Sequence, residues 1–216
     1  LDRGHYLEAL EYFEEVWEHF PDPAVRGPEL AMSMALCRKM LGMEAKAGER
    51  YGLIGHWKLD EAGGNRVADA TGQKNDGTIG PTPPDWTAGK AGGAHRFDWT
   101  NSLSIPRSTT LNIGESGGDF SVALWVNMEA FHWPNALFSK QGSAAETLSL
   151  DARWDKIIYA IATQSEKWET GATKVGLVKG QWTHVALVKA GMEVKIFLNG
   201  KLELRDTLKA PVLPNL

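Results

Sequence analysis

The protein has 216 residues, of which 43% are hydrophobic and 23% charged, so it can bury a core and wholesale disorder is excluded. Its formal net charge of −4 excludes an overall basic field for a nucleic-acid partner. Its single cysteine, Cys37, excludes an intramolecular disulfide and a multi-cysteine metal site. No apolar run approaches the roughly 18 residues of a membrane span, so we expect no membrane insertion within this segment.

The composition divides the chain near residue 50. Residues 1–50 hold 10 acidic and 6 basic side chains and only four of the 23 glycines, which is typical of helices. Residues 51–216 have equal numbers of both charges and contain eight of the nine tryptophans, which is typical of a β-domain. We therefore expect a helical part over residues 1–50 and a β-domain over residues 51–216.

The first part shows the spacing of an amphipathic helix that ends at Pro21 and Pro23. A second helix is predicted from about Pro28 to Leu41, with Cys37 on its buried side. The apolar positions of the first helix recur every three or four residues: Tyr6, Leu10, Phe13, Val16 and Trp17. Such a short hairpin needs a neighbour to bury its apolar face.

Residues 4–14, followed by Pro21, resemble the second half of a tetratricopeptide repeat. In that family a glycine and a tyrosine close the turn, and a small alanine such as Ala9 lets the helices touch. Residues 29–46 are similar to the first helix and turn of a next repeat. The resemblance implies the end of an array that scaffolds protein contacts. A plain amphipathic hairpin is the alternative.

Strand signals in the second part recur roughly every 8 to 15 residues between clusters of Gly, Pro, Asn and Asp. Asn199-Gly200 between apolar runs predicts a tight hairpin. No helical pattern interrupts the strands, which favours an antiparallel β-sandwich or jelly roll. The predicted strands are 53–59, 94–98, 103–105, 120–126, 136–140, 148–150, 157–162, 182–188, 194–198 and 201–204.

Six stretches, in the expected order, resemble the laminin-G-like, concanavalin-A-like jelly-roll family. They are residues 53–61, 67–78, 89–98, 120–126, 180–186 and 197–201. Two features depart from that family. Trp99 stands where a glycine is usual, and the chain ends at Leu216 before the family's closing strands. The resemblance implies a mainly β fold whose closing strands are missing, so that an unpaired edge is exposed.

Catalysis is not expected in this segment. Glycoside-cleaving enzymes of this fold place two carboxylates at alternate positions of one strand, and the sequence contains no such pair. It also lacks the motif of a serine nucleophile and the histidine spacing of a zinc site. An accessory role beside a catalytic domain outside this chain stays open.

A calcium site is the first binding hypothesis, because hard cations prefer clustered carboxylate and amide oxygens. Asp69, Asn75 and Asp76 fall within eight residues of a glycine-bearing loop, and Asp98 could approach from a neighbouring strand end. The resemblance implies that many relatives bind calcium at such loops. The alternative is an Asx-turn loop whose side chains cap their own backbone.

Glycan binding is the second hypothesis, because sugar faces stack on exposed aromatic rings while polar side chains orient the hydroxyls. Four tryptophans lie among polar or turn residues such as Asn101: Trp99, Trp133, Trp154 and Trp168. Packing at the rim of the sandwich is the alternative for each of them. Trp57, Trp125 and Trp182 lie within predicted strands and are expected in the core.

These observations together predict a non-catalytic recognition module for carbohydrate binding or adhesion. The alternative is a protein–protein interaction platform that combines helical repeats and sandwich. The family resemblance implies an extracytoplasmic location, periplasmic or at the cell surface. Fold alone does not fix the function.

Overall fold

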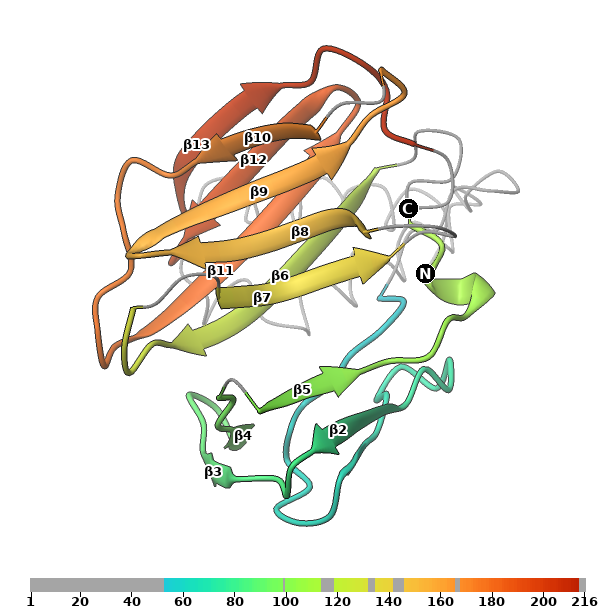
Figure 1. Ribbon diagram of the computed structural model, residues 1–216, viewed down its shortest axis with the longest axis vertical. Helices are drawn as coiled ribbons and strands as arrows, with labels where there is room; N and C mark the ends of the chain where they lie inside the picture. Colours follow the sequence, from blue (N-terminus) through green and yellow to red (C-terminus); the bar gives the residue numbers. More distant parts are fainter. Residues whose placement is uncertain are drawn as a thin grey trace, which may run out of the picture.

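The computed structural model describes residues 53–98, 100–113, 119–131, 135–141, 146–165 and 168–213 (Figure 1). The predicted helical hairpin and tetratricopeptide-like segment lie outside these residues. Within the described ranges the chain is antiparallel β, with one short 3-10 helix, η1 (Thr109–Leu111), and no α-helix. The predicted mainly β, antiparallel class is therefore confirmed.

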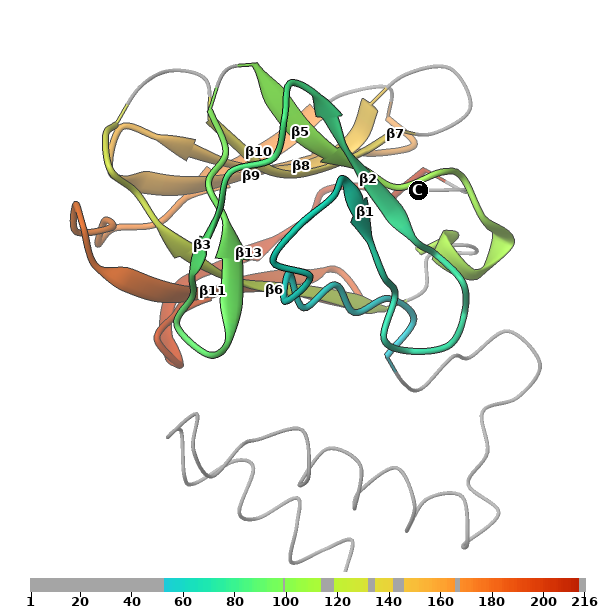
Figure 2. The same cartoon turned by 90° about the horizontal axis from the view of Figure 1, so that it is seen from below.

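Two four-stranded antiparallel sheets pack face to face (Figures 1 and 2). The first, which we call the β8 sheet, has the order β10-β9-β8-β7. The second, the β11 sheet, has the order β13-β12-β11-β6. The β8 sheet consists of β7 (Asn135–Gln141), β8 (Glu146–Arg153), β9 (Lys156–Ala162) and β10 (Trp168–Ala172). The β11 sheet consists of β6 (Phe120–Asn127), β11 (Trp182–Ala190), β12 (Glu193–Leu198) and β13 (Lys201–Thr207).

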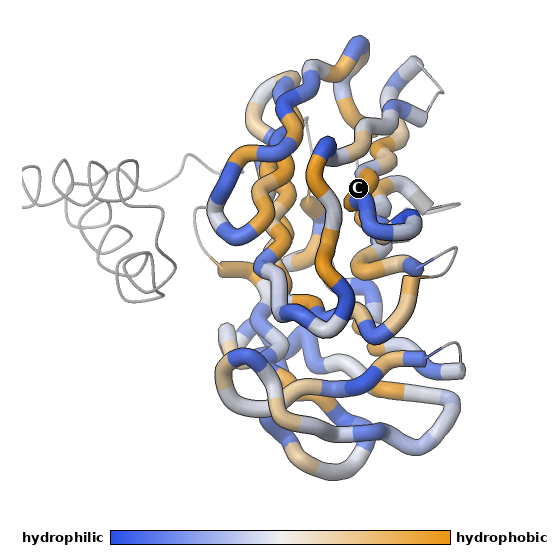
Figure 3. Tube along the Cα trace, turned by 90° about the vertical axis from the view of Figure 1, so that its left-hand side faces the viewer, coloured by the Kyte–Doolittle hydropathy of each residue, from blue (hydrophilic) through white to orange (hydrophobic). Residues whose placement is uncertain are grey.

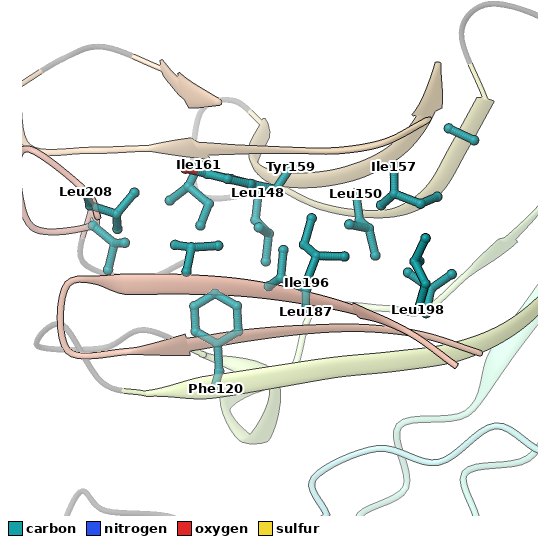
Figure 4. Close-up of a cluster of buried hydrophobic side chains, with 14 of the residues drawn as sticks. Phe120, Leu148, Leu150, Ile157, Tyr159, Ile161, Leu187, Ile196, Leu198 and Leu208 are labelled. Carbon is teal, nitrogen blue, oxygen red and sulfur yellow. The ribbon is translucent and has the colours of Figure 1, made fainter. Parts of the chain in front are cut away.

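The core lies between these two sheets (Figure 4). Alternate residues of β9, β11 and β12 are buried, as expected for strands with one face on the core. Ile157, Tyr159 and Ile161 of β9 face Leu187 and Ile196 across the sandwich. Each fully buried aliphatic side chain of this kind contributes about 1.5–3 kcal/mol. Tyr159 keeps its hydroxyl satisfied by donating to Asp206 at 2.9 Å.

A smaller region lies at one end of the sandwich (Figure 1). It contains a three-stranded sheet in the order β1-β2-β5 and a separate β3–β4 hairpin. Figure 3 shows fewer hydrophobic positions here than along the two large sheets. The strands are β1 (Arg66–Val67), β2 (Gly77–Pro81), β3 (Trp86–Ala88), β4 (Gly93–His95) and β5 (Asn101–Ser104).

The long alternating strands and the Asn199-Gly200 turn were predicted correctly, and both turn residues have positive φ. The predicted opening strand over residues 53–59 was wrong. Only Trp57 forms a bridge there, to Asp69, and Leu59 leaves the extended conformation with a φ of 61°. The strands β1, β2, β3 and β10 had no predicted counterpart, because all are short and three contain or adjoin glycine or proline.

Candidate functional site

The predicted calcium loop is a closely hydrogen-bonded hub around the buried Asp69. Its carboxylate accepts the backbone N–H groups of His56, Thr71 and Asn75 at 3.0, 3.0 and 3.1 Å. The Thr71 hydroxyl donates to the same carboxylate at 2.7 Å. Burial alone would raise the pKa of Asp69, but these hydrogen bonds outweigh it and hold the pKa below its usual value.

The other two loop residues also have protein partners. Asp76 accepts the Asp69 N–H at 2.9 Å and pairs with Arg66. The Asn75 amide donates to the Ile54 carbonyl at 2.9 Å and accepts the Thr110 hydroxyl at 3.0 Å. These contacts support the Asx-loop alternative, because they occupy oxygens that a cation would need.

Asp98 is not brought into this loop. Its carboxylate accepts the backbone N–H and the hydroxyl of Thr100, both at 2.7 Å, and these bonds lower its pKa. Across the part of the chain that the structure describes, no group of three or more His, Cys, Asp or Glu side chains could hold a metal ion. Calcium binding stays a prediction.

The predicted glycan-binding tryptophans do not gather at one place. Trp99 and Trp133 lie outside the described residues. Trp154 is 68% exposed in the turn between β8 and β9, whereas Trp168 is 47% exposed at the start of β10. Trp168 pairs with Ala162, at the other end of β9 from that turn. The length of β9 therefore separates them by about 20 Å.

Asn101 lies apart from both described tryptophans. It begins β5, and its side-chain oxygen accepts the Asp98 N–H at 3.3 Å. Asn101 and Asp98 therefore form a local turn contact. A common glycan site built from the predicted residues has no support in the described geometry.

A hollow of about 340 Å³ lies beside Trp86, a residue that the sequence reasoning did not select. It lies between the β3–β4 hairpin and the chain segment before β1. Its walls are formed by Leu59, Ala62, Trp86, Thr87, Ala88 and Gly93. The one sequence signal for it was a tryptophan that follows directly on the turn residues Pro83, Pro84 and Asp85.

Hydrogen bonds lock the two walls of this hollow together. The indole Nε1 of Trp86 donates to the Gly64 carbonyl at 3.0 Å. The Gly93 N–H donates to the Asp60 carboxylate at 2.6 Å. A Cβ on Gly93 would lie 2.5 Å from the Leu59 carbonyl oxygen, so only glycine permits this approach. The indole is therefore held in a fixed orientation.

Two lining residues have a backbone conformation that non-glycine residues rarely adopt. The φ angles of Leu59 and Ala62 are 61° and 55°. Each such residue costs about 1–3 kcal/mol, and the surrounding structure must compensate for it. Strain of this kind occurs at binding sites, so we take the hollow as a candidate site.

The buried His95 stands behind Trp86. Their ring centroids are 5.3 Å apart in an edge-to-face arrangement. Nε2 of His95 accepts the Asp85 N–H at 3.0 Å, so the proton of the neutral ring is on Nδ1. Burial lowers the pKa of His95, and the nearby carboxylates of Asp85 and Asp98 oppose this shift only in part. The wall behind the indole is thus uncharged at neutral pH.

Trp125, expected in the core, lies instead on the outer face of the β11 sheet and is 36% exposed. Successive side chains of β6 point to opposite faces of the sheet, and its neighbours Leu124 and Val126 pack against the core. Trp125 contacts His184 of β11, with ring centroids 5.2 Å apart. The Lys90 ammonium from the β3–β4 turn lies 5.6 Å from the indole centroid. The turn thus covers part of this face.

The sequence matches a family model, Laminin_G_3, of the concanavalin A-like lectin/glucanases superfamily. The match covers residues 97–215, which is more than half of the chain and includes both large sheets. The hollow beside Trp86 precedes the matched residues. A comparison with curated proteins gave no match.

Solved structures share the fold. Domain 4 of AbnA, a GH43 extracellular arabinanase from Geobacillus stearothermophilus solved with arabinotriose, has a TM-score of 0.57 and 23% identity, covering 76% of this chain and 82% of that one. The binding domain of Paraclostridial Mosquitocidal Protein 1 has a TM-score of 0.57 and 10% identity, covering 73% and 44%. The binding domain of botulinum neurotoxin DC, solved with rat synaptotagmin II, has a TM-score of 0.53 and 12% identity, covering 72% and 40%. This chain thus spans less than half of each toxin domain.

Proposed function

The chain belongs to the concanavalin A-like lectin/glucanase superfamily, and from this premise we propose that it is a non-catalytic, carbohydrate-binding module of an extracytoplasmic protein. The hollow beside Trp86 carries the proposal. The related arabinanase domain was solved with a bound sugar, which supports a glycan as the ligand class.

The hollow has the chemistry of a small glycan site. The apolar face of a sugar ring stacks on an indole, and polar groups around it orient the hydroxyls. Trp86 supplies the ring, and Thr87 is the polar residue among those that line the hollow. The volume of about 340 Å³ lies at the lower end of the roughly 300–1,000 Å³ of ligand pockets, which fits a short glycan segment. Because the indole is already fixed, binding costs little side-chain entropy.

Binding without turnover is supported by the lining of the hollow. Glycoside hydrolysis uses two carboxyl groups on either side of the scissile bond. None of the six residues that line the hollow carries one. Asp151 accepts the Ser149 hydroxyl at 2.9 Å, and Asp155 pairs with Lys156 at 3.2 Å, so both have structural partners away from the hollow.

A glycan array followed by calorimetry on the whole 216-residue chain tests this proposal. Trp86→Ala should lower the affinity for an array hit by about tenfold or more, since it removes the stacking surface. Trp86→Phe keeps an aromatic face and should retain part of the affinity. Trp168→Ala, an exposed tryptophan outside the hollow, is the matched control. A folded chain that binds no glycan, or equal losses for Trp86→Ala and Trp168→Ala, would contradict the proposal.

Protein binding is the second candidate function. The outer face of the β11 sheet displays Trp125 and Leu202, which are 36% and 40% exposed, and the related neurotoxin domain was solved with a protein partner. Solvent-facing sheet faces normally carry polar residues, so an aromatic face favours a covering partner. Trp125→Ala should then weaken binding to a protein partner and leave the glycan affinity unchanged. Both are measured on the parent chain and on the variant.

A further inference from the structure

A second exposed feature lies at the end of the β8 sheet where the β8–β9 turn and the β10–β11 connection meet (Figure 1). We call residues 153–156 and 173–179 the tip. It displays three large apolar side chains: Trp154, Val175 and Val178 are 68, 49 and 53% exposed. Apolar side chains that gather on an exposed surface favour an interaction site there.

The two parts of the tip are held together by main-chain contacts. The Leu177 N–H donates to the Asp155 carbonyl at 2.6 Å, and the Thr173 N–H donates to the Ile157 carbonyl at 2.9 Å. Gly176 lies directly against the Asp155 carboxylate, where a Cβ would clash. These bonds hold the turn that carries Trp154 against the loop that carries Val175 and Val178.

Packing fixes the direction of the valines. Leu177 is buried in the core cluster, and it anchors the loop between Val175 and Val178. Both valines are therefore turned outward. Trp154 is held in the left-handed region, with a φ of 53°, at the apex of the turn between β8 and β9. The apolar side chains are thus presented by a rigid support.

The charge of the tip is opposite to that of the whole chain. It contains four cations, Arg153, Lys156, Lys174 and Lys179, and one anion, Asp155. The chain as a whole has a net charge of −4. The structure pairs Asp155 with Lys156 at 3.2 Å, which leaves the tip with an excess of positive charge.

We propose that the tip docks on the surface of an anionic lipid bilayer. A tryptophan and two valines fit the apolar boundary below the headgroups, and Lys174 and Lys179 in the same loop as the valines attract anionic lipids. None of the tip residues lines the hollow described above. The inference goes beyond the proposed glycan binding and stands independently of it.

Docking of this kind needs no membrane-spanning segment. Among the residues that the structure describes, no helix is long and apolar enough to cross a membrane. A single apolar anchor binds a bilayer weakly, and a basic patch beside it adds the second signal that stable binding requires. The tip combines both within two adjoining loops.

Vesicle flotation of the whole chain tests the proposal. We expect it to float with vesicles of phosphatidylcholine and phosphatidylserine but not with phosphatidylcholine alone, and less so as salt is raised. Trp154→Ala should lower the fraction bound by about tenfold. The double variant Lys174→Glu, Lys179→Glu should lower it at least as much, because each cation contributes about fivefold.

Two controls separate this surface from the glycan site. Trp168→Ala, at the far end of β9, and Trp86→Ala, in the hollow, should both float like the parent chain. Soluble glycerophosphoserine should not compete, since the proposal requires a bilayer and not a free headgroup. A folded parent chain that does not float, or a loss with Trp168→Ala equal to that with Trp154→Ala, would overturn the inference. A parent chain that floats but binds no glycan would overturn the proposed function alone.

Discussion

Trp86 follows turn residues and Trp154 lies in a turn, yet the structure places them in opposite surroundings. Trp86 is half-buried, with Nε1 bonded to the Gly64 carbonyl and His95 packed against its edge. Trp154 is 68% exposed at the apex of a hairpin. The first ring forms the wall of a hollow, and the second is presented outward. The comparison shows that the same residue type can be fixed in a wall or presented to solvent, according to the contacts that support it.

The supports of the two regions differ as well. The hollow belongs to the small region of β1–β5 (Figure 2). Polar side chains such as Asp69 and Asp60 hold the loops of this region together. The tip rests on the apolar core through Leu177. Substitutions of polar side chains in the small region should therefore disturb the hollow. Substitutions of the exposed residues of the tip should leave the fold intact.

Asp69→Ala should have the largest effect of the variants considered. It leaves three backbone N–H groups and one hydroxyl without their acceptor, which should lower the free energy of unfolding by about 2–3 kcal/mol. Urea unfolding measures this difference. Asp98→Ala, which removes an exposed carboxylate with local partners, should cost less. Equal losses for the two variants would show that the Asp69 hub does not support the small region.

The lowered pKa of Asp69 gives this prediction a pH dependence. Because the folded pKa lies below the unfolded value, the stabilisation is fully present above about pH 4 and is lost as the pH falls through the folded pKa. The difference in the free energy of unfolding between the parent chain and Asp69→Asn should therefore shrink in acid.

If calcium occupies the Asp69 loop, adding calcium should raise the melting temperature of the parent chain. The hydrogen-bonded loop predicts no change.

Gly93→Ala should have the next largest effect, and only on the hollow. The added Cβ would lie 2.5 Å from the Leu59 carbonyl, and relieving this contact costs about 1–3 kcal/mol. The variant should lose glycan affinity, as measured by calorimetry, and keep vesicle binding. Gly63→Ala is the control, because nothing lies within 4 Å of an added Cβ there. Unchanged glycan affinity in Gly93→Ala would separate the hollow from the binding site.

Mild acid should weaken the small region further through His95. Its folded pKa is lowered, so the unfolded chain takes up the proton first, and stability falls as the pH decreases below about 6.5. Protonation also removes the acceptor of the Asp85 N–H. The melting temperatures of the parent chain and of His95→Gln, measured between neutral and mildly acidic pH, test this prediction. The melting temperature of the variant should change less with pH. His184 has a pKa lowered by burial and contributes in both chains.

Trp154→Gly should have the smallest effect on stability and the opposite sign. Glycine adopts a φ of 53° without strain, so the variant should be about 0.5–1 kcal/mol more stable, or unchanged, in urea unfolding. Vesicle binding should be lost at the same time. A clear loss of stability would mean that the indole packs on the fold and is not reserved for a partner.

The sequence predicts the sandwich well because its strands alternate visibly. Val194, Ile196 and Leu198 mark one face of a strand without any tertiary information. The same alternation puts Trp125 opposite Leu124 and Val126, but the exposure of that outer face could not be predicted from the strand pattern alone. The exposed outer aromatic face therefore emerges only from the structure.

The candidate site was harder to predict because it joins distant residues. Leu59 and Trp86 share a hollow although 27 positions separate them, and no local pattern connects them. Trp154 and Trp168 look equivalent in the sequence, but the path of β9 carries them to opposite ends of one sheet. Asp69 and Asp76 do meet in one hydrogen-bonded loop, whereas the donors from His56 and Thr71 could not be inferred.

The pairing of β6 with β11 has a consequence for the order of folding. β6 ends at Asn127, and its only partner in the described β11 sheet begins at Trp182. During synthesis β6 therefore leaves the ribosome long before its hydrogen-bonding partner exists. Such non-local pairing slows folding and leaves a strand edge open to association with other chains. Nascent chains that stop before β11 should consequently depend on chaperones more than the completed chain does.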